Sequence, residues 1–565
     1  MALCPLPRSF QPPVRSRLLP VGSRFAALGL CLGLGLNLAL INNSIAQDSI
    51  ANSIPQPSSP QASLAPASLA QASLAQASLA QATDDGSVAA DGSQTDRPPS
   101  SGSLETGLLD QFCRFSSLAA AQKEALRTAS LDRPEKRLPY SEMLADHSQQ
   151  LHQCRDTHWP QKQALWIRLY PCDLQEGRLE HIFDRIVNQG YNEVFVEVFY
   201  DGRVMLPKAD NPTPWPSVLN EPGQENTDLF ALAVAAGQQR GLEVYAWMFS
   251  MNFGYTYAQR PDRQNALAQN GQGQTSLDLV NNEVQVFIDP YNALAQWDYR
   301  ILVEAILKRQ PDGVLFDYIR YPRGEGAASV VTRVQDLLIH GPAARQALLN
   351  RAMNQKGRGF IERFLQKGYV SVNDINELNK QYPQETEALW QGRQPQLRDK
   401  SLTPEVEQQS LQQDLWLLAV AHAQRGVLDF LGLANQPAQR AEVPAGAVFF
   451  PSGNQTVGQQ GFDSRLQPWN QFPDSIQWHP MAYGICGGTH CIVAEVQRVL
   501  DAAPAGTWVQ PALAGRWGEA MGDRPSLDDQ MLALKAATPQ LPAVSHFAYS
   551  WQYPQDDHSR KFCYH

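Results

Sequence analysis

The chain has 565 residues, of which 43% are hydrophobic and 18% are charged, so it is long enough to bury a large core. It carries 56 acidic residues against 46 lysines and arginines, a formal net charge of −10. This acidic excess argues against a nucleic-acid-binding protein, which normally shows a basic patch or a basic excess.

The first 46 residues have the pattern of a targeting segment. Four arginines precede an apolar run at 25–41, and small residues follow at Ser44 and Ala46. This order predicts a cleaved signal peptide over 1–46. The alternative is an uncleaved anchor, because the apolar run is slightly long. No later stretch is long and apolar enough to span a bilayer, so we expect no stable membrane span after signal removal.

A low-complexity region follows at 47–103. The pentapeptide QASLA or PASLA repeats at 61, 66, 71 and 76, a period that matches neither a helix nor a strand. Its composition is typical of a disordered linker. The next stretch, 104–160, is weakly helical and is predicted to form a helical N-terminal extension.

From residue 161 to 565 the chain alternates short apolar runs with segments of helical periodicity. Near-continuous apolar runs are typical of parallel strands that are buried on both faces, and eight strand–helix units indicate a (β/α)₈ TIM barrel of the α/β class. The eight predicted strands are 164–171, 193–204, 242–249, 313–322, 447–453, 475–484, 507–515 and 544–554.

The stretch 323–443 is rich in helical patterns and has no clear strand. It is predicted to be a long helical insertion after the fourth strand. Without it, the remaining barrel has a length close to the roughly 250 residues typical of this fold.

Six cysteines lie beyond the signal peptide, and an even number in an exported protein favours disulfides. Cys486 and Cys491 are close enough in sequence to close a small loop; a metal site with His490 is the alternative, but it would lack a fourth ligand. Cys172 ends the first strand and Cys563 follows the eighth, and these strands are neighbours in a closed barrel. The predicted pairs are Cys486–Cys491, Cys172–Cys563 and Cys113–Cys154.

Active sites of such barrels lie at the carboxyl ends of the strands. Polar and aromatic residues at those ends suit a carbohydrate, whose apolar ring faces stack on aromatic side chains while its hydroxyls need polar partners. A carboxyl group among aromatic residues is desolvated, which raises its pKa in the direction that an acid catalyst needs. The candidates are Asp317 and Glu197 for catalysis, and Tyr483, Trp551, His479, Arg320, Trp247, Asp201 and Gln510 for substrate binding.

Several stretches of the predicted barrel together resemble the bacterial family 10 glycosylhydrolase-like proteins. The most specific is DGVLFDYIRYP at 312–322, and the others lie at 193–204, 213–219, 227–249, 287–311 and 475–484. The resemblance implies a TIM-type barrel, an activity on polysaccharide or cell-wall glycan, and an active-site carboxylate at Asp317. Two positions depart from the family pattern: Tyr318 stands where many relatives have a second aspartate, and Tyr245 where they often have histidine.

A looser likeness to family 18 chitinases rests on Asp317, Met481, Tyr483 and Trp551. The glutamate acid of those enzymes has no counterpart here, because Tyr318 and Ile319 occupy the equivalent place.

Each candidate also has a structural interpretation. Asp317 could pair with Arg320 or Arg323 to hold the insertion, and Glu197 is either a site carboxylate or one bridged to Arg168. His479 could be a hydrogen-bonded core residue, Trp247 a core ring, and Asp201 a solvated turn residue. We expect Asp317 as proton donor or electrostatic stabiliser with Glu197 as its partner.

The sequence therefore predicts an exported glycoside hydrolase, periplasmic or extracellular, that acts on a polysaccharide or cell-wall glycan without a cofactor or required metal. The alternatives are a non-catalytic glycan-binding barrel and a structural envelope protein. No glycine-rich phosphate loop follows a strand and no G-x-S-x-G elbow occurs, which disfavours a nucleotide-binding protein and a serine hydrolase.

Overall fold

The computed structural model describes residues 109–280, 284–393 and 403–563. The predicted signal peptide (1–46) and linker (47–103) lie outside these described residues, and so does a short part of the predicted insertion.

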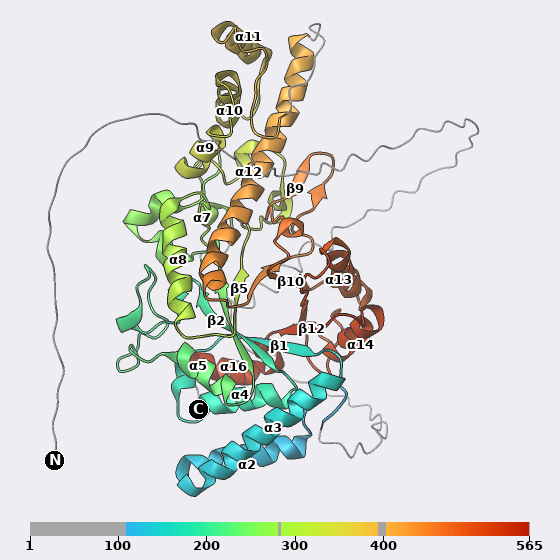
Figure 1. The fold of residues 1–565 in the computed structure, drawn as a ribbon. Coiled ribbons are helices and arrows are strands. Elements are labelled where there is room, and N and C mark those ends of the chain that lie inside the picture. Colours follow the sequence, from blue (N-terminus) through green and yellow to red (C-terminus); the bar gives the residue numbers. More distant parts are fainter. Residues whose placement is uncertain (1–108, 281–283, 394–402, 564–565) are drawn as a thin grey trace, which may run out of the picture. The chain divides into compact units, whose positions relative to one another are not determined.

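Eight parallel strands close into a barrel, in the spatial order β1-β12-β11-β10-β7-β5-β4-β2, and β2 pairs again with β1 (Figure 1). The predicted α/β class and (β/α)₈ architecture are therefore confirmed. The strands are β1 (Lys162–Ile167), β2 (Glu193–Tyr200), β4 (Glu243–Phe249), β5 (Gly313–Asp317), β7 (Ala445–Phe449), β10 (Gln477–Ala482), β11 (Ala512–Ala514) and β12 (Ala543–Phe547).

Burial on both faces explains why these strands are apolar throughout. All eight residues of β2 are buried, because one face packs into the barrel and the other against the helices. A two-residue strand, β3 (Arg203–Val204), folds back on β2 in antiparallel fashion.

Helices connect most of the strands in the expected alternation (Figure 1). They are α4 (Arg178–Asn188) after β1, α5 (Leu229–Gln238) after β2, α8 (Ala293–Leu307) after β4, α12 (Pro404–Arg440) after β5, α13 (His490–Ala502) after β10, α14 (Leu527–Ala537) after β11, and α15 (Tyr549–Gln552) and α16 (Pro554–Phe562) after β12. Residues 450–476, all of which are described, contain no α-helix; β8 (Thr456–Val457), β9 (Gly461–Asp463) and a 3₁₀ turn connect β7 to β10.

The helix α4 shows how sequence pattern and packing agree. Its buried residues include Leu179, Ile182, Phe183 and Ile186, a spacing that forms one apolar stripe facing the barrel. Burial of each such side chain contributes about 1.5–3 kcal/mol. The helix stops before Gly190, which has φ +78° and whose Cβ, if present, would lie 2.5 Å from a backbone oxygen of the N-terminal extension.

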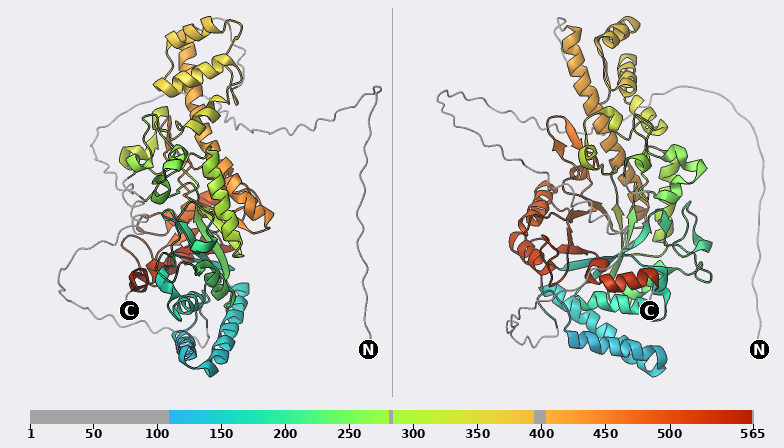
Figure 2. Two further views of the ribbon diagram at one scale, coloured as in Figure 1. Left: turned by 90° about the vertical axis from the view of Figure 1, so that its left-hand side faces the viewer. Right: turned by 180° about the vertical axis from the view of Figure 1, so that it is seen from behind.

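The N-terminal extension forms two helices, α2 (Ser117–Asp132) and α3 (Arg137–Thr157), which lie side by side and pack on α4 (Figure 2). Arg155, which is buried, fixes the end of α3 to the barrel: it donates hydrogen bonds to the carbonyls of Gly190, Phe112 and Pro160.

The segment after β5 contains α9 (Pro342–Leu349), α10 (Gln355–Lys367) and α11 (Val372–Gln381), which together with α12 make the predicted insertion largely helical. It also contains β6 (Val330–Val331), which pairs with β9. By length and composition α12 could cross a membrane, contrary to the expectation that no such stretch exists; however, more than half of its apolar window is buried, and it packs on α8, β5 and β7.

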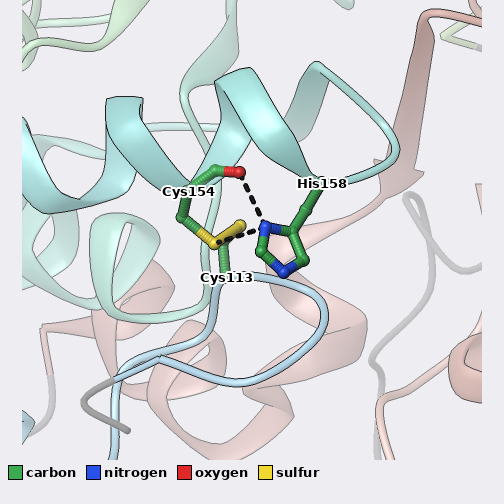
Figure 3. Close-up of side chains that lie close together, drawn as sticks. All are labelled: Cys113, Cys154 and His158. Carbon is green, nitrogen blue, oxygen red and sulfur yellow. Dashed lines mark hydrogen bonds between the residues drawn. A yellow bond between two sulfur atoms is a disulfide. The ribbon is translucent and has the colours of Figure 1, made fainter.

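Three disulfides link described residues: Cys113–Cys154, Cys172–Cys563 and Cys486–Cys491. The second joins the 3₁₀ turn Pro171–Leu174, which follows β1, to the residue that caps α16, and so links the two ends of the barrel sequence. His158 lies against Cys154 (Figure 3), but both cysteines of that pair are bonded to each other and offer no thiolate to a metal. Three disulfides are typical of proteins in an oxidising compartment.

Several predicted strands run too far at their carboxyl ends. The fourth was expected to reach residue 322, whereas β5 ends at Asp317. The residues beyond it are apolar for another reason: the loop after β9 covers them, with Tyr321 N donating to the Arg465 carbonyl and Gln467 donating to the Ile319 carbonyl.

Candidate active site

The carboxyl ends of β2, β4 and β5 bring the two predicted catalytic residues to one side of the barrel. These strands are neighbours, and their registers place Glu197 beside Trp247 and Phe249 beside Asp317. Trp247, on the middle strand, therefore stands between the two carboxyl groups.

Asp317 is 7% exposed and has two hydrogen-bond donors. The indole Nε1 of Trp247 lies 3.1 Å from its Oδ2, and the backbone N–H of Tyr318 lies 2.6 Å from its Oδ1. Burial raises the pKa of Asp317, against the lowering effects of the Tyr318 N–H, Arg320 and Trp247. Asp317 makes no ion pair with Arg320 or Arg323 among the described residues, so it does not hold the insertion in the way the structural interpretation expected.

Glu197 has no exposed surface and is bridged to Arg168. Both carboxylate oxygens accept from the guanidinium, one of them from Nη2 at 3.1 Å. The same guanidinium donates to Asp201 at 3.3 Å. Burial raises the pKa of Glu197 to about 7, opposed by Arg168 and assisted by Asp201 and Asp317. The sequence offered two alternatives for Glu197, a site carboxylate or a partner of Arg168. In the structure Glu197 is bridged to Arg168 and also lies near Asp317.

Two residues at these strand ends have a left-handed backbone although neither is glycine. Tyr318 has φ +52° and Asp201 has φ +49°. Such conformations cost of order 1–3 kcal/mol and collect at functional sites. At Tyr318 the conformation accompanies the hydrogen bond from its N–H to Asp317.

A cavity of about 730 Å³ opens at the carboxyl ends of the strands. Arg168, directly after β1, lines it together with Glu197 of β2 and Trp247 of β4, and Phe547 and Trp551 line it from β12 and α15. Asp317 does not line this cavity; it is next to it through its hydrogen bond to Trp247. A volume of several hundred Å³ with aromatic side chains in its wall is typical of small-molecule sites, and here charged side chains make up much of the rest of the lining.

The predicted sugar contacts are placed unequally. Trp551 lines the cavity, whereas Tyr483 packs beside it, with its ring 5.9 Å from that of Phe547. Burial raises the pKa of Tyr483, and the nearby Asp317 raises it further. Asp201, partly exposed, belongs to the site through Arg168.

Arg320 does not reach the cavity. It is buried beside the rings of Tyr318 and Phe450, with its guanidinium carbon 4.6 Å and 5.7 Å from their centroids, and it donates to the Tyr321 carbonyl. Its place is under the loops after β5 and β7 rather than in the site.

Two further predicted residues lie elsewhere. His479 is fully buried in the barrel interior, with Nε2 3.2 Å from Gln477 and its ring against Phe195. Gln510 was expected at the carboxyl end of the seventh strand, but β11 begins only at Ala512; Gln510 precedes it and donates to Glu193, at the opposite end of the barrel.

The predicted site did not include the C-terminal helix. Asp557 and Lys561 of α16 line the cavity, as does Arg524 from the loop after β11. The sequence signal that could have placed α16 here is the Cys172–Cys563 pair, because it joins the end of α16 to the turn that follows β1.

No protein-family model matches the chain, and no curated protein matches it either. The resemblance to family 10 glycosylhydrolases thus depends on the sequence stretches alone.

Solved structures give slight similarities. A hypothetical protein from Ruminiclostridium thermocellum has 18% identity and a TM-score of 0.22, covering 28% of this chain and 77% of that one. A GH20 exo-beta-N-acetylglucosaminidase from Vibrio harveyi has 8% identity and a TM-score of 0.34, covering 71% of this chain and 52% of that one. The pneumococcal virulence factor StrH has 10% identity and a TM-score of 0.35, covering 71% and 81%. At these values the activities of those proteins do not carry over to this chain.

Proposed function

We propose that this protein is an exported glycoside hydrolase that cleaves a polysaccharide or cell-wall glycan at the cavity lined by Glu197, Trp247 and Trp551. The observation that carries the proposal is a pair of buried carboxyl groups next to Trp247: Glu197, which lines the cavity, and Asp317, which lies behind the Trp247 ring and is hydrogen-bonded to it. Glycoside hydrolysis needs two such groups, one of which holds a proton near neutral pH.

The environments of the two carboxyl groups suggest different roles. Asp317 has only neutral hydrogen-bond donors and is desolvated, which favours its protonated form and a role as proton donor. Glu197 is held by the cationic Arg168, which favours its ionised form over what burial alone would allow. It would stabilise positive charge that develops on the sugar ring, or act as nucleophile or base.

Export is part of the proposal. The basic and apolar pattern of residues 1–46 supports it, and so do three disulfides, which persist in oxidising compartments.

The test is release of reducing ends from a panel of bacterial envelope and extracellular glycans, with the wild type beside Asp317→Asn. This substitution removes the acid at nearly constant shape. Activity in the wild type that falls by about 10²–10⁴-fold in a folded variant is the expected result. Equal activity in both proteins would contradict the assignment of Asp317.

A non-catalytic glycan-binding barrel is the second candidate. Two observations favour it: both oxygens of Glu197 are occupied by Arg168, and Asp317 does not line the cavity. Tight binding of a glycan by the wild type, without release of reducing ends across the panel, would select this function.

A further inference from the structure

Arg524 in the cavity wall is buried without a polar partner for its side chain among the described residues. It lies on the loop after β11 and is only 5% exposed. Its Nη1 atom is enclosed and has no hydrogen-bond partner, and within the described part of the chain its guanidinium forms no ion pair. A buried guanidinium without partners costs free energy. This cost indicates a partner that comes from outside the protein.

The backbone around Arg524 is well fixed. Met521 and Arg524 exchange two backbone hydrogen bonds of 2.9 and 3.1 Å around a turn that contains Gly522, which has φ +59°. The same loop is tied to α15 because Arg516 Nε donates to the Trp551 carbonyl at 2.8 Å. The Arg524 guanidinium carbon thus lies 5.7 Å from the centroid of the Trp551 ring, and both side chains line the same cavity.

Most of the other charged groups on the cavity lining have an oppositely charged partner within the protein. Arg168 pairs with Glu197, Arg516 with Glu519, and Asp557 with Arg560. Among the described residues, Arg524, Lys561 and the exposed Asp523 are the charged lining residues without an ion pair, so the unpaired charge on the lining is mainly positive.

Two neighbours act on Arg524 electrostatically without binding it. Burial lowers the pKa of Arg524, and Tyr483 and Glu495 oppose this effect. The Oε2 atom of Glu495 instead accepts from the Gly484 N–H at 2.9 Å. Among the described residues no hydrogen bond or ion pair joins the Glu495 carboxyl to the Arg524 guanidinium, and Arg524 lines the cavity.

We infer that the cavity takes an acidic glycan, whose sugar carboxylate pairs with the Arg524 guanidinium while its ring stacks on Trp551. The planar fork of arginine matches a carboxylate in bidentate geometry, and an aromatic ring beside it suits the apolar face of a sugar. The inference rests on the proposed function, because it assumes that the cavity is the glycan site, and it names the substrate class: carboxylate-bearing polysaccharide rather than neutral glycan.

Isothermal titration calorimetry with matched oligosaccharides tests this inference. The probes are fragments of polygalacturonate, alginate, hyaluronan and peptide-free cell-wall glycan, each measured beside its own carboxyl-reduced form. The wild type is expected to bind at least one carboxylated probe about 10- to 100-fold more tightly than the reduced form. Arg524→Gln should remove this difference, and Arg524→Lys should keep part of it.

The control variant is Arg425→Gln, which removes a surface arginine of α12 that is paired with Asp429. It should bind every probe as the wild type does. Thermal melting distinguishes loss of a ligand contact from misfolding: Arg524→Gln should melt no lower than the wild type, because it removes an unpaired buried charge.

The outcomes separate this inference from the proposed function. Equal binding or cleavage of carboxylated and reduced probes, unchanged by Arg524→Gln, would overturn the inference and leave the glycosidase proposal standing. Failure to bind or cleave any glycan, acidic or neutral, would overturn both.

Discussion

Two glutamates on the same strand, β2, lie at opposite ends of the barrel interior. Glu197 is near the carboxyl end and is held by Arg168; Glu193 is at the amino end, where Lys162 Nζ lies 3.7 Å away and Gln510 donates at 2.7 Å. Burial raises the pKa of both.

The difference between the two glutamates is what they face. Glu197 lines a cavity together with aromatic side chains, whereas Glu193 is enclosed by polar neighbours of the barrel floor. A raised pKa by itself therefore does not mark a catalytic group. A carboxyl group must also be accessible to a substrate, and in this fold the substrate binds at the carboxyl end of the barrel.

The largest expected effect comes from exchanging each of these glutamates for glutamine. Glu197→Gln should lower kcat/KM for the cleaved glycan by about 10²–10⁴-fold, because it removes a charge at the cavity floor. Glu193→Gln, the matched change four residues earlier, should keep activity within about threefold of the wild type.

Circular dichroism and thermal melting would show whether both variants fold. Similar losses of activity in both folded variants would mean that a position on the cavity lining does not set Glu197 apart from Glu193.

The next effect concerns the anchor of α16 at the cavity. Arg560 forms a completely buried ion pair with Asp173 at 2.7 Å and donates to the Arg168 carbonyl. Arg560→Met should lower the free energy of unfolding by about 3–5 kcal/mol, since it leaves Asp173 buried without its cation. Urea denaturation measures the change.

Arg300→Met, which removes a solvent-exposed partner of Glu304, is the control and should cost less than about 1 kcal/mol. If the free energy of unfolding falls by the same small amount in both variants, the Arg560–Asp173 ion pair does not hold α16 in place.

A smaller effect is a pH dependence of stability from Glu193. Its folded-state pKa is raised above the ordinary value of 4.5, so between that pH and its raised pKa the folded protein holds more protons than the unfolded one. Stability from this group is therefore present at low pH and is lost as the pH rises through that window. The Tm of Glu193→Gln should fall less than that of the wild type over the same range; parallel curves would contradict the raised pKa.

The smallest effect is expected at His479. Burial lowers its pKa to about 3, so it stays neutral at every pH at which the protein would work. His479→Gln should leave the shape of the pH profile of kcat/KM unchanged between about pH 5 and 8. A lost or shifted limb in that profile would assign a titrating role to His479.

The architecture could be predicted from the sequence because local patterns determine it. The apolar run of β2 follows from burial on both faces, and the apolar stripe of α4 follows from burial of one helix face against the barrel. Strand ends were predicted less well: Tyr321, four residues beyond the end of β5, is buried under a distant loop and not in the sheet, and Gln510 lies before a strand of only three residues.

The candidate site was predicted only in part. Glu197, Trp247 and Asp317 follow from the rule that strand ends carry the chemistry, and the family resemblance adds to the prediction of Asp317. Arg524 and α16 reach the cavity only through the three-dimensional path of loops, which no periodicity encodes.

The decisive experiment for the proposed site is a crystal structure of Asp317→Asn with bound oligosaccharides from the acidic and neutral probe sets. We expect sugar density in the cavity, stacked on Trp551, with a glycosidic oxygen within hydrogen-bonding distance of the substituted side chain at position 317. Sugar bound only outside this cavity, or a bound chain whose glycosidic bonds all lie beyond the reach of residues 197 and 317, would contradict the proposal.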